Sequence, residues 1–109
     1  MIIADMLEAC SMKLITGNAS GEVRGVYTCD LLSHAALHVQ KGDAWITVIN
    51  NINIVAVAAV TNAVCVILPE DIEIPPHVKD KAIARGITVI SSPLTASDII
   101  VKIHELLKI

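Results

Sequence analysis

The sequence predicts a single α/β domain over residues 1–109, in which a mostly parallel β-sheet is covered by helices on both faces. Its second half alternates short β-branched runs with helical periodicities, a pattern typical of parallel strands joined by right-handed crossovers. Hydrophobic residues make up 54% of the chain and charged residues 17%, which indicates either strands that are buried on both faces or apolar surface that meets a partner. Phe is absent, so the core must be built from Ile, Val, Leu and Ala.

The segment Ala44–Pro69 is predicted to form the centre of this sheet as a strand, a buried helix and a second strand. The strands are expected at 44–49 and 64–68, where β-branched and other apolar residues follow one another. Between them, residues 53–62 are predicted to be helical, with Asn53 as the N-cap whose side chain accepts a backbone N–H.

The alternative interpretation of this segment is a membrane span, because residues 52–68 are almost wholly apolar and the mean hydropathy of the chain is +0.67. A span needs about 20 apolar residues with suitable flanks. Asn53, Thr61 and Asn62 interrupt the run, and no cluster of Lys or Arg lies beside it. We therefore expect a buried core segment and no contact with a membrane.

The N-terminal residues predict a helix at 2–11, followed by strands at 12–16 and 23–28. The helix is indicated by apolar residues at spacings of three and four, namely Ile3, Met6, Leu7 and Cys10. The turn at 17–21 is interpreted as a tight, hairpin-like connection, with anion binding by its backbone N–H groups as the alternative. We expect this half of the chain to add an antiparallel pair of strands.

The next predicted helix runs from Asp30, its N-cap, to Gln40, and Gly42 follows at a position where helices often end. One side of this helix is apolar and is expected to pack inward. It consists of Leu31, Leu32, Ala35, Ala36 and Val39.

Asp30, His34 and His38 lie four residues apart on the polar side of that helix and suggest a metal site, since two His at this spacing can chelate an ion. The three ligands would span two turns, about 12 Å, and cannot all reach one ion. The preferred interpretation is a solvated helix face, and no metal or other cofactor is expected.

A further helix is predicted from the Pro75-Pro76 pair to Arg85, followed by a last strand at 87–91. A capping box that opens at Thr95 predicts the final helix, to about Lys108. The residues expected to face inward on this helix are Ile99, Ile100, Ile103, Leu106 and Leu107.

Charge and cysteine content exclude several classes of protein. The net charge of −3 and the lack of a basic stripe argue against nucleic-acid binding. Cys10, Cys29 and Cys65 are odd in number and show no CxxC spacing, which argues against disulfides and a zinc ribbon and favours a reducing cytoplasm. The N-terminus has no basic region and is not a signal peptide. Cys29 is interpreted as a small buried residue, with a lowered pKa at a helix start as the alternative.

Ser91, Ser92 and Thr95 lead from a predicted strand into a helix N-terminus, where the helix dipole and unpaired N–H groups favour phosphate. Such loops gather at the carboxyl edge of a parallel sheet, where ligands usually bind. Together with Asp30 at the start of another helix, these are the candidate ligand-binding residues. For Thr95, a role as a plain N-cap is nevertheless the preferred interpretation.

Three residues are candidates for contact with a partner protein. Leu37 stands in the middle of the polar side of its helix, near His34. Trp45 is the single Trp of the chain, and it either fills the core or anchors a partner surface.

Four segments, in their order and spacing, resemble the DRTGG domain: Gly25–Ser33, Gly42–Thr47, Asn53–Val57 and Gly86–Ser92. This domain is similar to the N-terminal domain of HPr kinase/phosphorylase, and the resemblance covers nearly the whole chain. It implies an α/β domain of a bacterial, cytoplasmic protein. Relatives accompany other domains in phosphotransacetylases and CBS-domain pyrophosphatases, where they look regulatory and help to dimerise the chain. The five-residue signature that names the family is absent from this sequence.

The resemblance also raises the prospect of HPr kinase activity, which the residues do not support. A P-loop needs G-x-x-x-x-G-K-[ST], and no Gly-Lys dipeptide occurs in the sequence. We therefore expect no enzyme. The preferred function is a non-catalytic regulatory or interaction module that forms a homodimer and can contact another protein. The alternative is a sensor domain for a small phosphorylated ligand or nucleotide.

Overall fold

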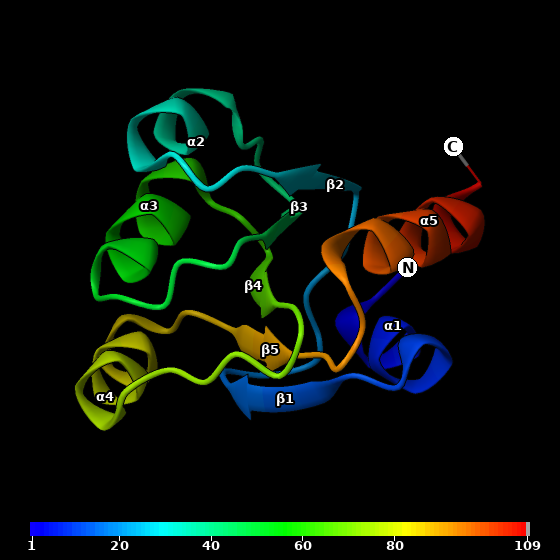
Figure 1. Ribbon diagram of the computed structural model, residues 1–109. Helices are drawn as coiled ribbons and strands as arrows, with labels where there is room; N and C mark the ends of the chain where they lie inside the picture. The colour runs from blue at the N-terminus through cyan, green and yellow to red at the C-terminus, as the bar shows by residue number, and fades with distance from the viewer. Residues whose placement is uncertain (109) are drawn as a thin grey trace.

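A five-stranded β-sheet organises residues 1–108, the part of the chain that this computed structural model describes (Figure 1). The strands lie in the order β1-β5-β4-β3-β2. Their bounds are Lys13–Thr16 (β1), Gly25–Thr28 (β2), Asp43–Ile46 (β3), Cys65–Leu68 (β4) and Val89–Ser91 (β5). Strands β2 to β5 pair in parallel, and β1 pairs with β5 in the antiparallel sense.

Within residues 1–108, helices cover both faces of the sheet (Figure 1). Their bounds are Ile3–Cys10 (α1), Leu32–His38 (α2), Asn53–Thr61 (α3), Pro76–Arg85 (α4) and Ala96–Leu107 (α5). The chain visits β2, β3, β4 and β5 in their spatial order, so right-handed crossovers place α2, α3 and α4 on the same face. Helices α1 and α5 lie on the opposite face. This arrangement confirms the predicted α/β fold with a mostly parallel sheet.

The two faces of the sheet bury separate, mainly aliphatic cores. Side chains alternate along β3, so Ala44 and Ile46 join the core under α1 and α5, whereas Trp45 joins the core under α2 to α4. Strand β4 is buried at all of its residues. Both cores therefore depend on the same two central strands.

Trp45 belongs entirely to the protein interior. Its side chain is 0% exposed, and its indole N–H donates to the carbonyl oxygen of Cys29 at 3.0 Å. A buried indole N–H needs such an acceptor. Of the two predicted roles of Trp45, core filling is confirmed, and the role as an anchor for a partner is wrong.

The central apolar segment forms α3 and β4 as predicted, but α3 starts differently. Asn53 is its first residue and not its N-cap. The side-chain oxygen of Asn51 accepts the backbone N–H of Asn53 at 2.9 Å, so the preceding Asn supplies the local acceptor. In the described part of the chain, none of the helices has the length and apolar character to span a bilayer.

Helix α2 is shorter than predicted and ends before Gln40. Its C-cap, Val39, has an extended backbone, and Gly42 lies outside the helix in a turn, with φ +86°. Leu31 and Ala36, which the sequence predicts to pack inward, are exposed. Leu31 precedes the helix with an extended backbone, so its side chain does not follow the helical periodicity.

The predicted hairpin-like connection between β1 and β2 is wrong. The two strands lie at opposite edges of the sheet. Strand β1 pairs with β5 instead, with Lys13 opposite Ser91 and Leu14 opposite Ile90. The antiparallel pair therefore joins the two ends of the chain and not two neighbouring segments.

The loop that follows β1 completes the start of α1. The carbonyl oxygens of Ala19 and Gly21 accept the N–H groups of Ala4 and Ile3, each at 2.9 Å. Helix α1 has no side-chain cap, and the first N–H groups of a helix have no partner within it. The loop thus serves as a backbone cap for α1.

Gly17→Ala is expected to destabilise the protein much more than Gly86→Ala. Gly17 has φ +80°, and an added Cβ would lie against the hydroxyl oxygen of Thr88 and 2.7 Å from its Cα. Gly86 has φ +67°, but nothing lies within 4 Å of an added Cβ. We expect a loss of about 3 kcal/mol or more at Gly17 and about 1 kcal/mol at Gly86, measured by urea unfolding. Equal losses would contradict this packing.

Candidate functional site

The carboxyl ends of the four parallel strands meet at one edge of the sheet, where ligands of α/β sheets usually bind. Ser91 ends β5 and Ser92 follows it, whereas Asp30 follows β2. Strands β4 and β3 lie between β5 and β2, which separates these positions by about 14 Å at about 4.8 Å per strand. The structure therefore does not bring Asp30 together with the Ser91–Thr95 loop.

Asp30 connects two neighbouring loops. One of its carboxylate oxygens accepts the hydroxyl of Thr47 at 2.8 Å and the N–H of Val48 at 3.0 Å. Thr47 is buried, so this hydrogen bond satisfies a hydroxyl that water cannot reach. Because the carboxylate points to the loop after β3, Asp30 does not cap α2, and the predicted N-cap is wrong.

Ser92 and Thr95 also hold local structure. Ser92 is buried, and its hydroxyl oxygen accepts the N–H of Leu94 at 3.1 Å. The hydroxyl oxygen of Thr95 accepts the N–H of Asp98 at 3.2 Å. The preferred interpretation of Thr95 as a plain N-cap is confirmed. Neither residue is among those that line the groove described next, and ligand binding by Ser92 and Thr95 stays a prediction.

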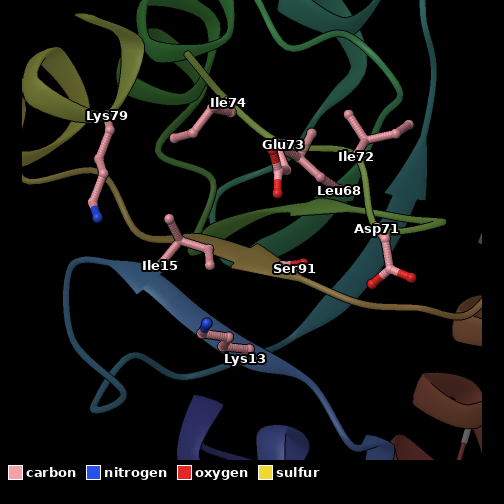
Figure 2. A pocket seen from close by; sticks show the side chains of 9 residues that line it. All are labelled: Lys13, Ile15, Leu68, Asp71, Ile72, Glu73, Ile74, Lys79 and Ser91. Carbon is pink, nitrogen blue, oxygen red and sulfur yellow. The ribbon is translucent and has the colours of Figure 1, made fainter. Parts of the chain in front are cut away.

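A groove of about 460 Å³ lies at the carboxyl edge between β1 and α4, beside the β4–α4 loop (Figure 2). Its lining comes from β1, from the stretch that runs from β4 into α4, and from β5. The lining residues are Lys13, Ile15, Leu68, Asp71, Ile72, Glu73, Ile74, Lys79 and Ser91. Ser91 is the one candidate ligand-binding residue that lines it.

Charged side chains line this groove in two pairs. Lys13 comes from β1 and Lys79 from α4, so the two ammonium groups belong to different walls (Figure 2). Asp71 and Glu73 belong to the β4–α4 loop, and the carboxylate of Glu73 points into the groove (Figure 2). Within residues 1–108, none of the four forms an ion pair within 4.0 Å. The groove therefore offers both cationic and anionic groups to a ligand.

The β4–α4 loop has a strained backbone at the groove. Glu70 and Asp71 have φ values of +58° and +56°, a region that costs residues other than Gly about 1–3 kcal/mol each. Their N–H groups donate to the carbonyl oxygens of Leu94 and Ser92, each at 2.9 Å. These hydrogen bonds stabilise the loop and fix its acidic side chains beside the groove.

Sequence reasoning missed Lys13, Glu73 and Lys79. The two lysines come from segments that meet only because β1 lies beside β5 and contacts α4. One local signal exists for the β4–α4 loop. After Glu70, acidic residues alternate with isoleucines over residues 71–74, between a buried strand and a helix. Such a loop at the carboxyl edge is a reasonable place to expect a ligand.

The candidate partner residues of α2 lie at the surface. Leu37 is 79% exposed, and His34 is exposed beside it. The rings of His34 and His38 stack at 3.9 Å, and Nδ1 of His38 donates to the carbonyl oxygen of His34 at 2.9 Å. Among residues 1–108, no group of three or more His, Cys, Asp or Glu is arranged to hold a metal ion. Contact of Leu37 and His34 with a partner stays a prediction.

The cysteines are not part of the groove. Burial raises the pKa of Cys65 to about 12. Burial also raises the pKa of Cys10, and the nearby charge of Lys102 lowers it in part. Cys29 is half-buried, and its thiol donates to the carbonyl oxygen of Leu31 at 3.5 Å. Cys10 and Cys65 thus remain thiols at neutral pH and serve as core residues.

Asp30→Ala is expected to lower the free energy of unfolding by about 1–3 kcal/mol, because the buried hydroxyl of Thr47 and the N–H of Val48 lose their acceptor. Asp30→Asn retains an acceptor oxygen and should keep most of that stability. Urea unfolding of both variants measures the difference. If the alanine variant were as stable as the unaltered protein, Asp30 would not have this structural role.

The fold has a known counterpart among solved structures, although no protein-family model and no curated protein matches this sequence. It is similar to the CBS and DRTGG domains from the regulatory region of Clostridium perfringens pyrophosphatase, solved with the activator diadenosine tetraphosphate. The TM-score is 0.69 at 14% sequence identity, and the match covers 89% of this chain. The chain spans 43% of the length of that structure. The fold is thus DRTGG-like.

Proposed function

We propose that this chain is a non-catalytic regulatory module. The observation that carries this proposal is the use of the polar side chains at the carboxyl edge. Asp30, Ser92 and Thr95 each accept a backbone N–H of a neighbouring loop or helix, and they do not converge on a place where a substrate could react. The DRTGG-like fold supports the proposal, because the solved neighbour comes from the regulatory region of a pyrophosphatase.

The groove lining also favours binding over catalysis. Nucleophilic catalysis requires a nucleophile within hydrogen-bond reach of a base that is itself oriented by a third group. Ser91 is the one hydroxyl side chain among the lining residues, and these residues include no His or Cys. Kinase activity toward HPr is therefore not part of the proposed function.

The proposed module associates with a second copy of itself through the ends of α2, α3 and α4. Leu37, Val60 and Ile83 lie in the last turns of these helices and are 79%, 69% and 58% exposed. Helix α3 packs against both α2 and α4, so the three exposed side chains belong to neighbouring helices. We call them the helix-end row. Exposed aliphatic groups in such a row are suited to an isologous contact.

Leu37→Glu is expected to weaken self-association about tenfold or more, because a buried Leu at an interface is replaced by a charge. Sedimentation velocity across micromolar concentrations measures the dimer fraction. Val101→Glu on α5 is the matched control, because Val101 is 56% exposed on the opposite layer. A monomer at all these concentrations for the unaltered protein would contradict the proposed homodimer.

A second candidate function, a sensor for a small phosphorylated ligand or nucleotide, is favoured by the groove. Its volume of about 460 Å³ lies within the range of small-molecule sites. Lys13 and Lys79 supply positive charge for a phosphate, and Ser91 supplies a hydroxyl. The solved neighbour was determined in complex with a nucleotide activator, which supports a nucleotide as a candidate ligand.

AMP, ATP or acetyl phosphate at about ten times its dissociation constant should raise the melting temperature by about 5 °C or more, because a ligand that binds only the native state stabilises it. Thermal unfolding with each compound, and with sodium sulfate at equal ionic strength as the control, measures this shift. No shift with any of the three up to millimolar concentrations would contradict the sensor function and leave the proposed homodimer in place.

A further inference from the structure

The groove between β1 and α4 keeps opposite charges apart. Lys13, Lys79, Asp71 and Glu73 all line it, yet within residues 1–108 none of them takes part in an ion pair. Oppositely charged side chains that share a groove without pairing are available to a ligand that carries both an anionic group and hydrogen-bond donors. A purely anionic or purely cationic ligand would face repulsion from one of the two pairs.

The basic side of the groove fits a phosphate group. Lys13 lies directly opposite Ser91 in the β1–β5 ladder, so their side chains emerge as neighbours on the same face. Lys79 reaches the groove from α4 on the other wall (Figure 2). Two ammonium groups and one hydroxyl can surround a phosphate, for which lysine is a common protein partner.

The acidic side of the groove fits a group that donates hydrogen bonds. Carboxylates accept hydrogen bonds and donate none when ionised. The carboxylate of Glu73 points into the groove, and that of Asp71 lies at its rim (Figure 2). The backbone N–H of Asp71 is bound to Ser92, which holds this acidic rim in place. Neighbouring ribose hydroxyls are donors that acidic residues bind in nucleotide sites.

The remaining lining of the groove is aliphatic and limits the size of the ligand. Ile15, Ile72 and Ile74 are half-buried and provide apolar surface, whereas Leu68 is almost fully buried. Aliphatic side chains of this kind can cover the face of a heterocyclic base. The volume of about 460 Å³ lies near the lower end of the range for small-molecule sites, which favours a mononucleotide over a dinucleotide.

From these features we infer that the groove binds a nucleoside monophosphate, with its phosphate at Lys13 and Lys79, its ribose at Glu73 and its base on the isoleucine surface. This inference rests on the sensor function and gives that function a site, a ligand class and an orientation. The site is distinct from the Ser92–Thr95 segment and from Asp30.

Isothermal titration of the full chain with AMP, adenosine and inorganic phosphate tests the inference. AMP should bind more tightly than either fragment, because it contacts both ends of the groove. Lys13→Ala and Lys79→Ala should each weaken AMP binding about tenfold, as expected for the loss of a hydrogen bond to a charged group. Lys81→Ala is the matched control, because Lys81 is an exposed lysine of the same helix outside the lining.

Glu73→Gln tests the ribose end of the proposed ligand independently of its phosphate end. This variant should weaken the binding of AMP and adenosine and leave phosphate binding unchanged or slightly stronger, because it removes a negative charge. Glu105→Gln on α5 is its control, since Glu105 is exposed and lies outside the groove. Unchanged unfolding midpoints would show that all variants keep the native fold.

The outcomes separate the inference from the function on which it rests. If AMP binds but Lys13→Ala and Lys79→Ala weaken it no more than Lys81→Ala does, the assigned site is wrong and the sensor function stands. Equal affinity for phosphate and AMP would overturn the nucleoside part of the inference. If none of the probes binds up to millimolar concentrations, while the thermal test still detects acetyl phosphate, the ligand class is wrong. If neither the titration nor the thermal test detects binding, both the sensor function and the assigned site are wrong.

Discussion

The burial of the central strands β3 and β4 between two helical layers is the constraint on which the rest of this structure depends. All residues of β4 are buried, and their side chains alternate between the two cores. Each face must then be closed by helices, since apolar side chains left in water would cost about 25 cal/mol per Å². With no Phe in the sequence, mainly aliphatic side chains fill both interiors, and Trp45 lies in the core under α2 to α4.

The same constraint moves the candidate site to the border of the sheet. The central strands have no free face, so a ligand can reach the sheet at its carboxyl edge, beside the edge strand β1. There Lys13 lies opposite Ser91, and the left-handed backbone of Glu70 and Asp71 turns the β4–α4 loop beside the groove. The hydrogen bonds from this loop to Ser92 and Leu94 join the groove to the segment that leads into α5.

Several polar residues at this edge stand where ligand-binding residues are common, but their hydrogen bonds stabilise the fold. Asp30 lies at the end of a strand and Ser92 in a strand-to-helix loop, both of which are common positions for ligand-binding groups. In this fold the carboxylate of Asp30 accepts hydrogen bonds from the next loop. The hydroxyl of Ser92 closes its own turn and is buried. The hydrogen bonds from the β4–α4 loop to Ser92 and Leu94 fix that loop beside the groove, and preorganisation of this kind lowers the cost of binding a ligand.

The sequence by itself determined the α/β class, the central α3–β4 segment, the ends of α4 and the N-cap at Thr95, because periodicity, proline and capping act between residues close in the chain. Ser91 is the part of the groove that was also predictable from sequence. The tertiary structure alone decided that β1 pairs with β5, that Asp30 binds the loop after β3, and that Lys13, Glu73 and Lys79 share a groove. These features depend on contacts between distant segments, and short-range patterns carry no information about which distant strands will become neighbours.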